Sequence, residues 1–151
     1  ISNPQILWQI YSNRAAIYTQ LADYEKADVD YRKALQLVKE LPETLQLQAW
    51  CSTTGNYAMM HYYQNTPESI KSYVTKLHDV LGVMEEHSMF DQNYLRFKQQ
   101  LCVYEEEFGN ILLAEEHVNE LLVLTFTNAA AAEMKERTLK QGYFREISWT
   151  E

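Results

Sequence analysis

The chain has 151 residues, of which 46% are hydrophobic and 23% are charged; these proportions suit a folded domain with a continuous core. Its formal net charge of −8 argues against a nucleic-acid-binding surface, because such surfaces rest on Lys and Arg that neutralise phosphates. With 4 Gly and 3 Pro, the sequence has too few turn-forming residues for a sheet-rich fold, so we expect long helices joined by short loops. It contains no run of about 18 apolar residues that could cross a bilayer, so we expect no membrane insertion.

The first part of the chain predicts two helices joined by almost no loop. Apolar residues recur at helical spacing over residues 11–21 and again over residues 24–38, on either side of a tight turn at Ala22 and Asp23. Two amphipathic helices connected this closely form an αα-hairpin.

The side chains of this hairpin resemble those of the tetratricopeptide repeat. The order of large and small residues matches that family at Tyr11, Ala15, Tyr18, Ala27, Tyr31 and Ala34. Small residues let two helices approach, and aromatic residues fill the groove between neighbouring helices. Three features depart from the pattern: Arg14 stands where Leu is usual, Ala22 stands where Gly is usual, and the closing Pro is delayed to Pro42.

Weaker copies of the same frame follow at a step of about forty residues. In the second copy, the frame expects Ala58, Ile70, Val74 and Leu77 to be buried, with Thr66 as the N-cap and Pro67 at the first position of the next helix. In the third copy, the matching positions are Cys102, Ala114, Val118 and Leu121.

The resemblance therefore implies an all-α fold. We expect a right-handed superhelical stack of about three tetratricopeptide-like hairpins, followed by a C-terminal helix and a tail. The repeats would span residues 5–41, 44–86 and 89–127, the last helix would span residues 129–142, and residues 1–151 would form a single domain.

In the tetratricopeptide family, the first helices of successive hairpins line a concave face that holds a protein or peptide. Carrying those positions across predicts a binding face made of Gln9, Asn13, Ala16, Gln20, Ser52, Asn56, Met59, Tyr63, Arg96, Gln99, Gln100 and Val103. Three primary amides share one repeat position, at Asn13, Asn56 and Gln100. An amide both donates and accepts hydrogen bonds, so this row could hold peptide backbone of any sequence.

Repeats of about forty residues also resemble those of bacterial peptide-pheromone receptors, and this resemblance implies a protein- or peptide-binding scaffold or sensor within a larger bacterial signalling or transcriptional regulator. The chain starts at Ile1 rather than Met, and its end reads as a continuing helix, so we expect a piece of a longer protein. We expect it in the cytoplasm, with a periplasmic sensor segment of a membrane protein as the alternative.

A cluster of aromatic residues and methionines leaves a further alternative open. Helix geometry cannot bury the whole set of Tyr57, Met59, Met60, Tyr62 and Tyr63. Part of the set packs in the core, and the rest would face a groove or another molecule. Such exposed aromatics would also suit a self-association module that forms a homodimer.

One segment near the end points to another class of protein. Residues 121–137 read LLVLTFTNAAAAEMKER, which resembles a motif that contacts single-stranded DNA in helicases of the UvrD/AddA class. That family also has a Gly-rich phosphate-binding loop ending in Gly-Lys, and no Gly of this chain is followed by Lys. The resemblance implies an accessory domain of a DNA-processing ATPase as the alternative function.

Nothing in the sequence predicts catalysis. The four histidines form no HExxH pattern, and neither Cys51 nor Cys102 lies in a zinc-ligand spacing. We therefore expect no enzyme activity, cofactor or metal, and we expect both cysteines to be buried. The acidic run at residues 105–107 predicts a solvated face, with an acidic rim for a basic partner as the alternative.

Overall fold

A computed structural model of the chain describes residues 3–107 and 116–121. Among these residues 86% are helical and none is in a strand, which confirms the all-α prediction. The chain divides into two compact units, residues 1–88 and residues 89–151. The prediction of one domain over residues 1–151 stays a prediction. The expected third turn, the helix over residues 129–142 and the tail lie outside the described residues.

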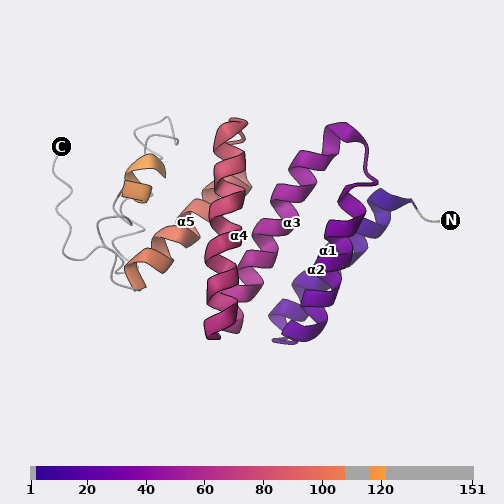
Figure 1. Cartoon of the computed structure of the whole chain (residues 1–151), viewed down its shortest axis with the longest axis horizontal. Helices are drawn as coiled ribbons and strands as arrows, with labels where there is room; N and C mark the ends of the chain where they lie inside the picture. The colour runs from indigo at the N-terminus through magenta and orange to yellow at the C-terminus, as the bar shows by residue number, and fades with distance from the viewer. Residues whose placement is uncertain (1–2, 108–115, 122–151) are drawn as a thin grey trace. The chain divides into compact units, whose positions relative to one another are not determined.

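The first unit contains four helices that form two hairpins (Figure 1). They are α1 (Pro4–Gln20), α2 (Tyr24–Val38), α3 (Glu43–Gln64) and α4 (Pro67–Glu86). Helix α1 packs against α2, α3 packs against α4, and α3 also contacts α2 and α1. The second hairpin therefore stacks on the first, over ranges close to the expected repeats. A superhelical tetratricopeptide path stays a prediction.

Local hydrogen bonds fix where these helices begin. The Asp23 side chain accepts from the backbone N–H of Lys26 at 3.3 Å, which caps α2 after a two-residue turn. Thr66 and Ser69 form a reciprocal capping box before α4, with Pro67 in its first turn. The predicted N-cap and Pro position are confirmed.

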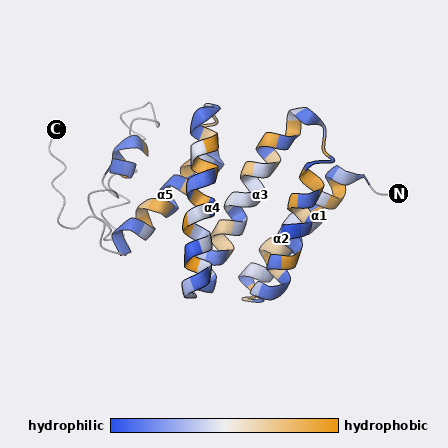
Figure 2. Ribbon diagram, in the orientation of Figure 1, coloured by the Kyte–Doolittle hydropathy of each residue, from blue (hydrophilic) through white to orange (hydrophobic). Residues whose placement is uncertain are grey.

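Small side chains lie where the hairpins come closest. Ala15 and Ala27 are completely buried, and they pack in one cluster with Tyr31, Tyr57 and Met60. The rings of Tyr31 and Tyr57 are stacked, with centroids 5.2 Å apart. Hydrophobic residues recur along every helix of the unit (Figure 2). The expectation that small residues permit close helix packing holds for this unit.

The buried face of α4 differs from the expected one. The prediction placed Ile70 and Val74 in the core, but both are only half-buried, whereas Ser69 and Tyr73 are buried. The capping box explains the difference, because the Ser69 hydroxyl accepts from the N–H of Thr66 at 2.8 Å and holds this side of the helix inward. Tyr73 and Leu77 follow at intervals of four residues and are fully buried.

The aromatic and methionine cluster on α3 is divided between core and surface. Tyr57, Met59 and Met60 are buried, whereas Tyr63 keeps 55% of its surface exposed. Tyr62 is half-buried and its ring lies 5.2 Å from that of Tyr73. The sequence left open whether these residues pack in the core or lie on the surface, and the structure shows some of them in each place.

The described part of the second unit consists of α5 (Gln92–Glu107) and a helical stretch over residues 116–121. The buried ammonium of Lys98 contacts the Glu120 carboxylate at 2.7 Å, which joins the two segments. Cys51 of the first unit and Cys102 of the second are both buried and free, as predicted. In the described parts of both units, no helix is long and apolar enough to span a membrane.

Candidate peptide-binding groove

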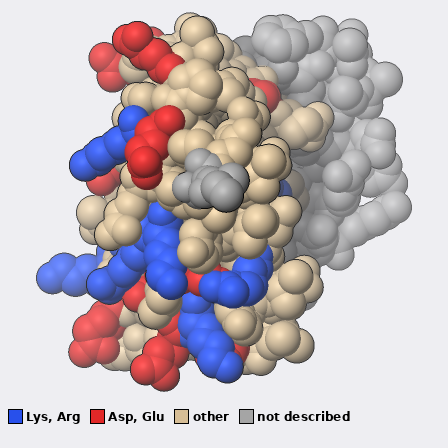
Figure 3. Space-filling view, turned by 90° about the vertical axis from the view of Figure 1, so that its right-hand side faces the viewer, with Lys and Arg blue, Asp and Glu red and all other residues tan. Residues whose placement is uncertain are grey.

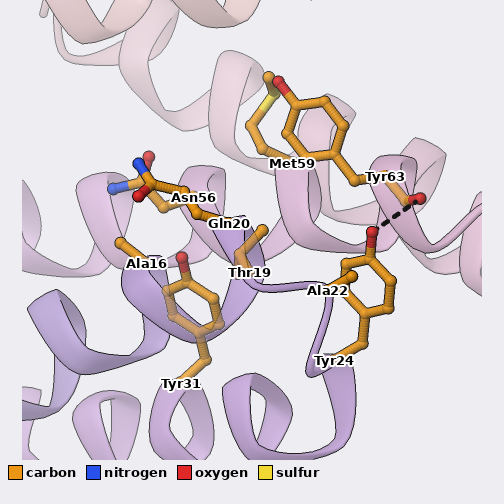
Figure 4. A pocket seen from close by; sticks show the side chains of 9 residues that line it. All are labelled: Ala16, Thr19, Gln20, Ala22, Tyr24, Tyr31, Asn56, Met59 and Tyr63. Carbon is orange, nitrogen blue, oxygen red and sulfur yellow. Dashed lines mark hydrogen bonds between the residues drawn. The ribbon is translucent and has the colours of Figure 1, made fainter.

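The first unit contains a pocket of about 510 Å³ formed by three of its helices and the turn after α1. Its lining, shown in Figure 4, consists of Ala16, Thr19, Gln20, Ala22, Tyr24, Tyr31, Asn56, Met59 and Tyr63. We call this pocket the α1–α3 groove. A pocket of this size could accommodate one or two side chains of a bound peptide together with their backbone.

The turn between α1 and α2 shapes one end of the groove. Ala22 has a positive φ of 58°, a left-handed conformation that favours Gly and reverses the chain within three residues. The Tyr24 hydroxyl then donates to the carbonyl oxygen of Tyr63 at 3.2 Å (Figure 4). This bond ties the start of α2 to the end of α3. The left-handed turn also explains why Gly is usual at this position in the family that the hairpin resembles.

The chemistry of the lining is apolar and aromatic, with a few amide and hydroxyl groups. Tyr31 and Met59 are buried and form the base of the groove, whereas Tyr63 is exposed at its edge. Gln20 and Asn56 supply primary amides. None of the nine lining side chains carries a charge. The groove therefore suits an uncharged ligand segment that offers an apolar side chain and hydrogen-bonding backbone.

The structure brings together five of the twelve residues that the repeat frame selected. These are Ala16, Gln20, Asn56, Met59 and Tyr63. Gln9 and Asn13 are exposed on α1 and Ser52 is half-buried on α3, but none of the three lines the groove. The remaining four lie on α5 in the second unit: Arg96, Gln99, Gln100 and Val103.

Sequence reasoning missed four lining residues. Tyr31 was matched to a position that packs between neighbouring helices, and the structure shows that it also lines the groove. Thr19 lies in the last turn of α1, Ala22 in the connecting turn and Tyr24 at the start of α2, where the positions carried over from the repeat do not reach. Ala22 could have indicated these residues, because it stands at the turn position where the repeat that the hairpin resembles usually has Gly.

A second, smaller hollow of about 210 Å³ lies between α1 and α2 and has a charged lining. There the Arg14 guanidinium donates to both carboxylate oxygens of buried Asp30, at 2.6 and 2.8 Å. These hydrogen bonds and the charge of Asp30 raise the pKa of Arg14. Figure 3 shows Lys and Arg side chains gathered across the face viewed from the α1 and α2 side. Arg14 stands where the repeat that this hairpin resembles usually has Leu, and it forms an ion pair between α1 and α2.

A buried polar cluster joins α2, α3 and α4. The Tyr57 hydroxyl donates to Asp28, His61 stacks on the Tyr57 ring at 4.6 Å, and the Lys76 ammonium lies 4.7 Å from that ring. Burial, assisted by the charge of Lys76, lowers the pKa of His61 to about 4. Burial and the bond to Asp28 raise the pKa of Tyr57 to about 12. Both groups are therefore neutral at pH 7, which suits a role in packing and hydrogen bonding between the helices.

We found no metal centre in the part of the chain that the structure describes. No group of three or more His, Cys, Asp or Glu side chains there could hold an ion. The expected absence of a cofactor stays a prediction.

Comparison with known proteins gives one family. The UvrD/REP helicase N-terminal domain matches residues 103–149, which is less than half of the chain and includes the segment 121–137 noted in the sequence. Of these residues, 103–107 and 116–121 lie in the described structure. No tetratricopeptide family matches. No curated protein and no solved structure is similar to the chain at a significant level.

Among the functions considered from the sequence, this match favours the accessory domain of a DNA-processing helicase over a signalling regulator. The match lies within the second unit and leaves residues 89–102 of it unmatched, whereas the α1–α3 groove belongs to the first unit.

Proposed function

We propose that the first unit is a protein-binding module that holds an extended peptide segment in the α1–α3 groove. The observation that supports this most directly is the lining itself, in which side chains from separate helices enclose about 510 Å³. Five of these side chains were also selected independently by their positions in the repeat frame.

The lining also supports a class of ligand. Because no charged side chain faces the groove, affinity comes from burial of an apolar side chain against Met59 and the tyrosines. The amides of Gln20 and Asn56 bind the backbone of the ligand. Binding should therefore depend only weakly on salt, unlike binding to a charged surface.

The test is a selection of peptides from a random displayed library, followed by affinity measurements with groove variants. Ala16→Arg places a long charged side chain at an exposed position of the groove and should weaken binding at least about 10-fold. Tyr63→Ala removes the exposed aromatic edge and should weaken it less. Gln9→Ala is the matched control, because Gln9 is exposed on the same helix but outside the groove. Peptides that bind the Ala16→Arg variant at full affinity would contradict the proposal.

The family match favours a second candidate, in which the chain is an accessory region of a DNA-processing helicase. In this case residues 121–137 would contact single-stranded DNA, as the motif that they resemble does, and the first unit would recruit a protein partner to that site. The chain itself would not hydrolyse ATP, because no Gly is followed by Lys in the sequence. A sensor role in a signalling regulator stays a prediction.

Binding of labelled oligo(dT) at low salt distinguishes the two candidates. The helicase candidate expects binding that a Thr125→Ala/Phe126→Ala variant loses. The peptide-binding candidate alone expects none, because a net charge of −8 repels phosphates. Binding that persists in the variant would exclude the motif as the contact, and a lack of binding would leave the helicase candidate without support.

A further inference from the structure

The side of α1 that faces away from α2 and α3 exposes a row of aliphatic side chains. Ile6, Ile10, Ile17 and Leu21 keep 54%, 50%, 54% and 69% of their surface exposed, and we call them the outer stripe. Their spacing of four, seven and four residues places them on one face of the helix. None of them lines the α1–α3 groove. An apolar row of this length on a helix indicates a contact surface.

The charge distribution favours a second copy of the chain as the occupant of this surface. Residues 1–41 contain five Lys or Arg and five Asp or Glu, so the net charge of −8 comes from the rest of the chain. Two copies can therefore meet through the first hairpin without the repulsion that other surfaces would impose. The single charged residue of α1 is Arg14, and the Asp30 carboxylate of the same copy balances it.

The spacing of the outer stripe is symmetric about a point between Asn13 and Arg14. Ile10 and Ile17 lie at equal distances from that point, and so do Ile6 and Leu21. If two α1 helices pair antiparallel around a two-fold axis there, Ile10 of one copy meets Ile17 of the other. Ile6 then meets Leu21 of the second copy. A self-complementary patch of this kind is what a closed dimer requires.

The residues beside the axis suit the same arrangement. The two copies of Asn13 approach each other on one side, and a primary amide can both donate to and accept from its own symmetry mate. The two copies of Arg14 approach on the other side. Each guanidinium keeps two short hydrogen bonds to Asp30, so neither presents an unbalanced charge to the axis.

We propose that the outer stripe of α1 is a homodimer interface in which two chains pair antiparallel about a two-fold axis beside Asn13. The pairing leaves the α1–α3 groove of each copy lined as before. The proposal is independent of which function the groove or the second unit performs.

Sedimentation velocity of the whole chain, from low to several hundred micromolar, tests the interface. The wild type should show a reversible monomer–dimer equilibrium. An Ile10→Asp/Ile17→Asp variant, which puts four carboxylates into the paired stripes, should raise the dissociation constant at least about 100-fold. Phe90→Asp is the control, because Phe90 is 43% exposed but lies outside α1. Circular dichroism should show unchanged helix content in all variants.

A charge exchange at residue 13 tests the two-fold axis separately. Asn13→Asp and Asn13→Lys should each weaken the dimer, because like charges then meet across the axis. Mixing the two variants should restore dimers, each with one copy of either variant. A wild type that remains monomeric, a dimer that survives Ile10→Asp/Ile17→Asp, or equal loss with Phe90→Asp would overturn the interface. Mixed variants that do not dimerise would overturn the antiparallel register.

Discussion

Helices α1 and α3 have nearly the same charge content but opposite environments. Each carries one charged side chain, Arg14 in 17 residues and Glu43 in 22. Ten residues of α3 are buried, whereas only Ala15 is buried in α1. Among the described helices, α3 contacts α1, α2 and α4, whereas α1 contacts α2 and, less extensively, α3.

The difference shows which surfaces of the first unit remain available for binding. A helix with so little charge is expected to be covered on all sides. The chain itself covers α3, which accordingly has more buried residues than any other helix of the first unit. Two surfaces of α1 stay open to a binding partner. The side facing away from the other helices carries the outer stripe, and the edge shared with α3 forms the α1–α3 groove.

The largest expected effect comes from a cavity in α3. Met60 is 1% exposed and packs against Ala15, Ala27 and the tyrosines, so Met60→Ala should lower the free energy of unfolding by about 2–5 kcal/mol. The corresponding change in α1, Ile10→Ala, should cost no more than about 0.5 kcal/mol in dilute protein, because Ile10 is half exposed. Urea denaturation measures both. Equal losses would show that α1 is covered in solution even at low concentration.

Acidification should destabilise α3 through His61. The pKa of His61 is lowered to about 4 in the folded chain, against 6.5 for an ordinary histidine. The unfolded chain therefore takes up the proton first, and stability falls as the pH decreases from about 6.5 to 4. We expect a loss of about 5 °C in Tm across this window. His61→Phe should show a smaller loss over the same range, and an identical pH dependence would exclude His61 as the cause.

The smallest effect is expected where α1 ends. Ala22 adopts a positive φ, and a side chain in that conformation is strained by about 1–2 kcal/mol. Ala22→Gly relieves the strain but loses conformational entropy on folding, so the net gain should be about 0.5–1 kcal/mol. Thermal unfolding at low protein concentration measures it. Asn65 also has a positive φ, but Asn tolerates it better, so Asn65→Gly should gain less.

Local patterns predicted the hairpins well. The spacing of Ala15, Ala27 and Ala34 identified positions that are fully buried, because small residues at helical intervals let two helices pack closely. Thr66 and Pro67 identified the start of α4 for a similarly local reason. The prediction of which face of α4 is buried was wrong at Ile70 and Val74. The inward position of Ser69 involves a hydrogen bond to Thr66, which the spacing of apolar residues does not reveal.

The candidate site was predicted in part. The repeat frame found Gln20, Asn56 and Tyr63 because helical intervals fix which side of α1 and α3 they occupy. It missed Tyr24, whose position depends on a hydrogen bond to a carbonyl 39 residues away. It also did not foresee the ion pair between Arg14 and Asp30, because neither residue belongs to a pattern of the family that the hairpin resembles.

The most direct test of the groove is an ¹⁵N–¹H chemical-shift titration of the chain with a library-selected peptide. Under the proposed function, the largest perturbations fall on Gln20, Asn56 and Tyr63 and are reduced by Ala16→Arg. Perturbations confined to the outer stripe or to residues 103–121 would contradict it.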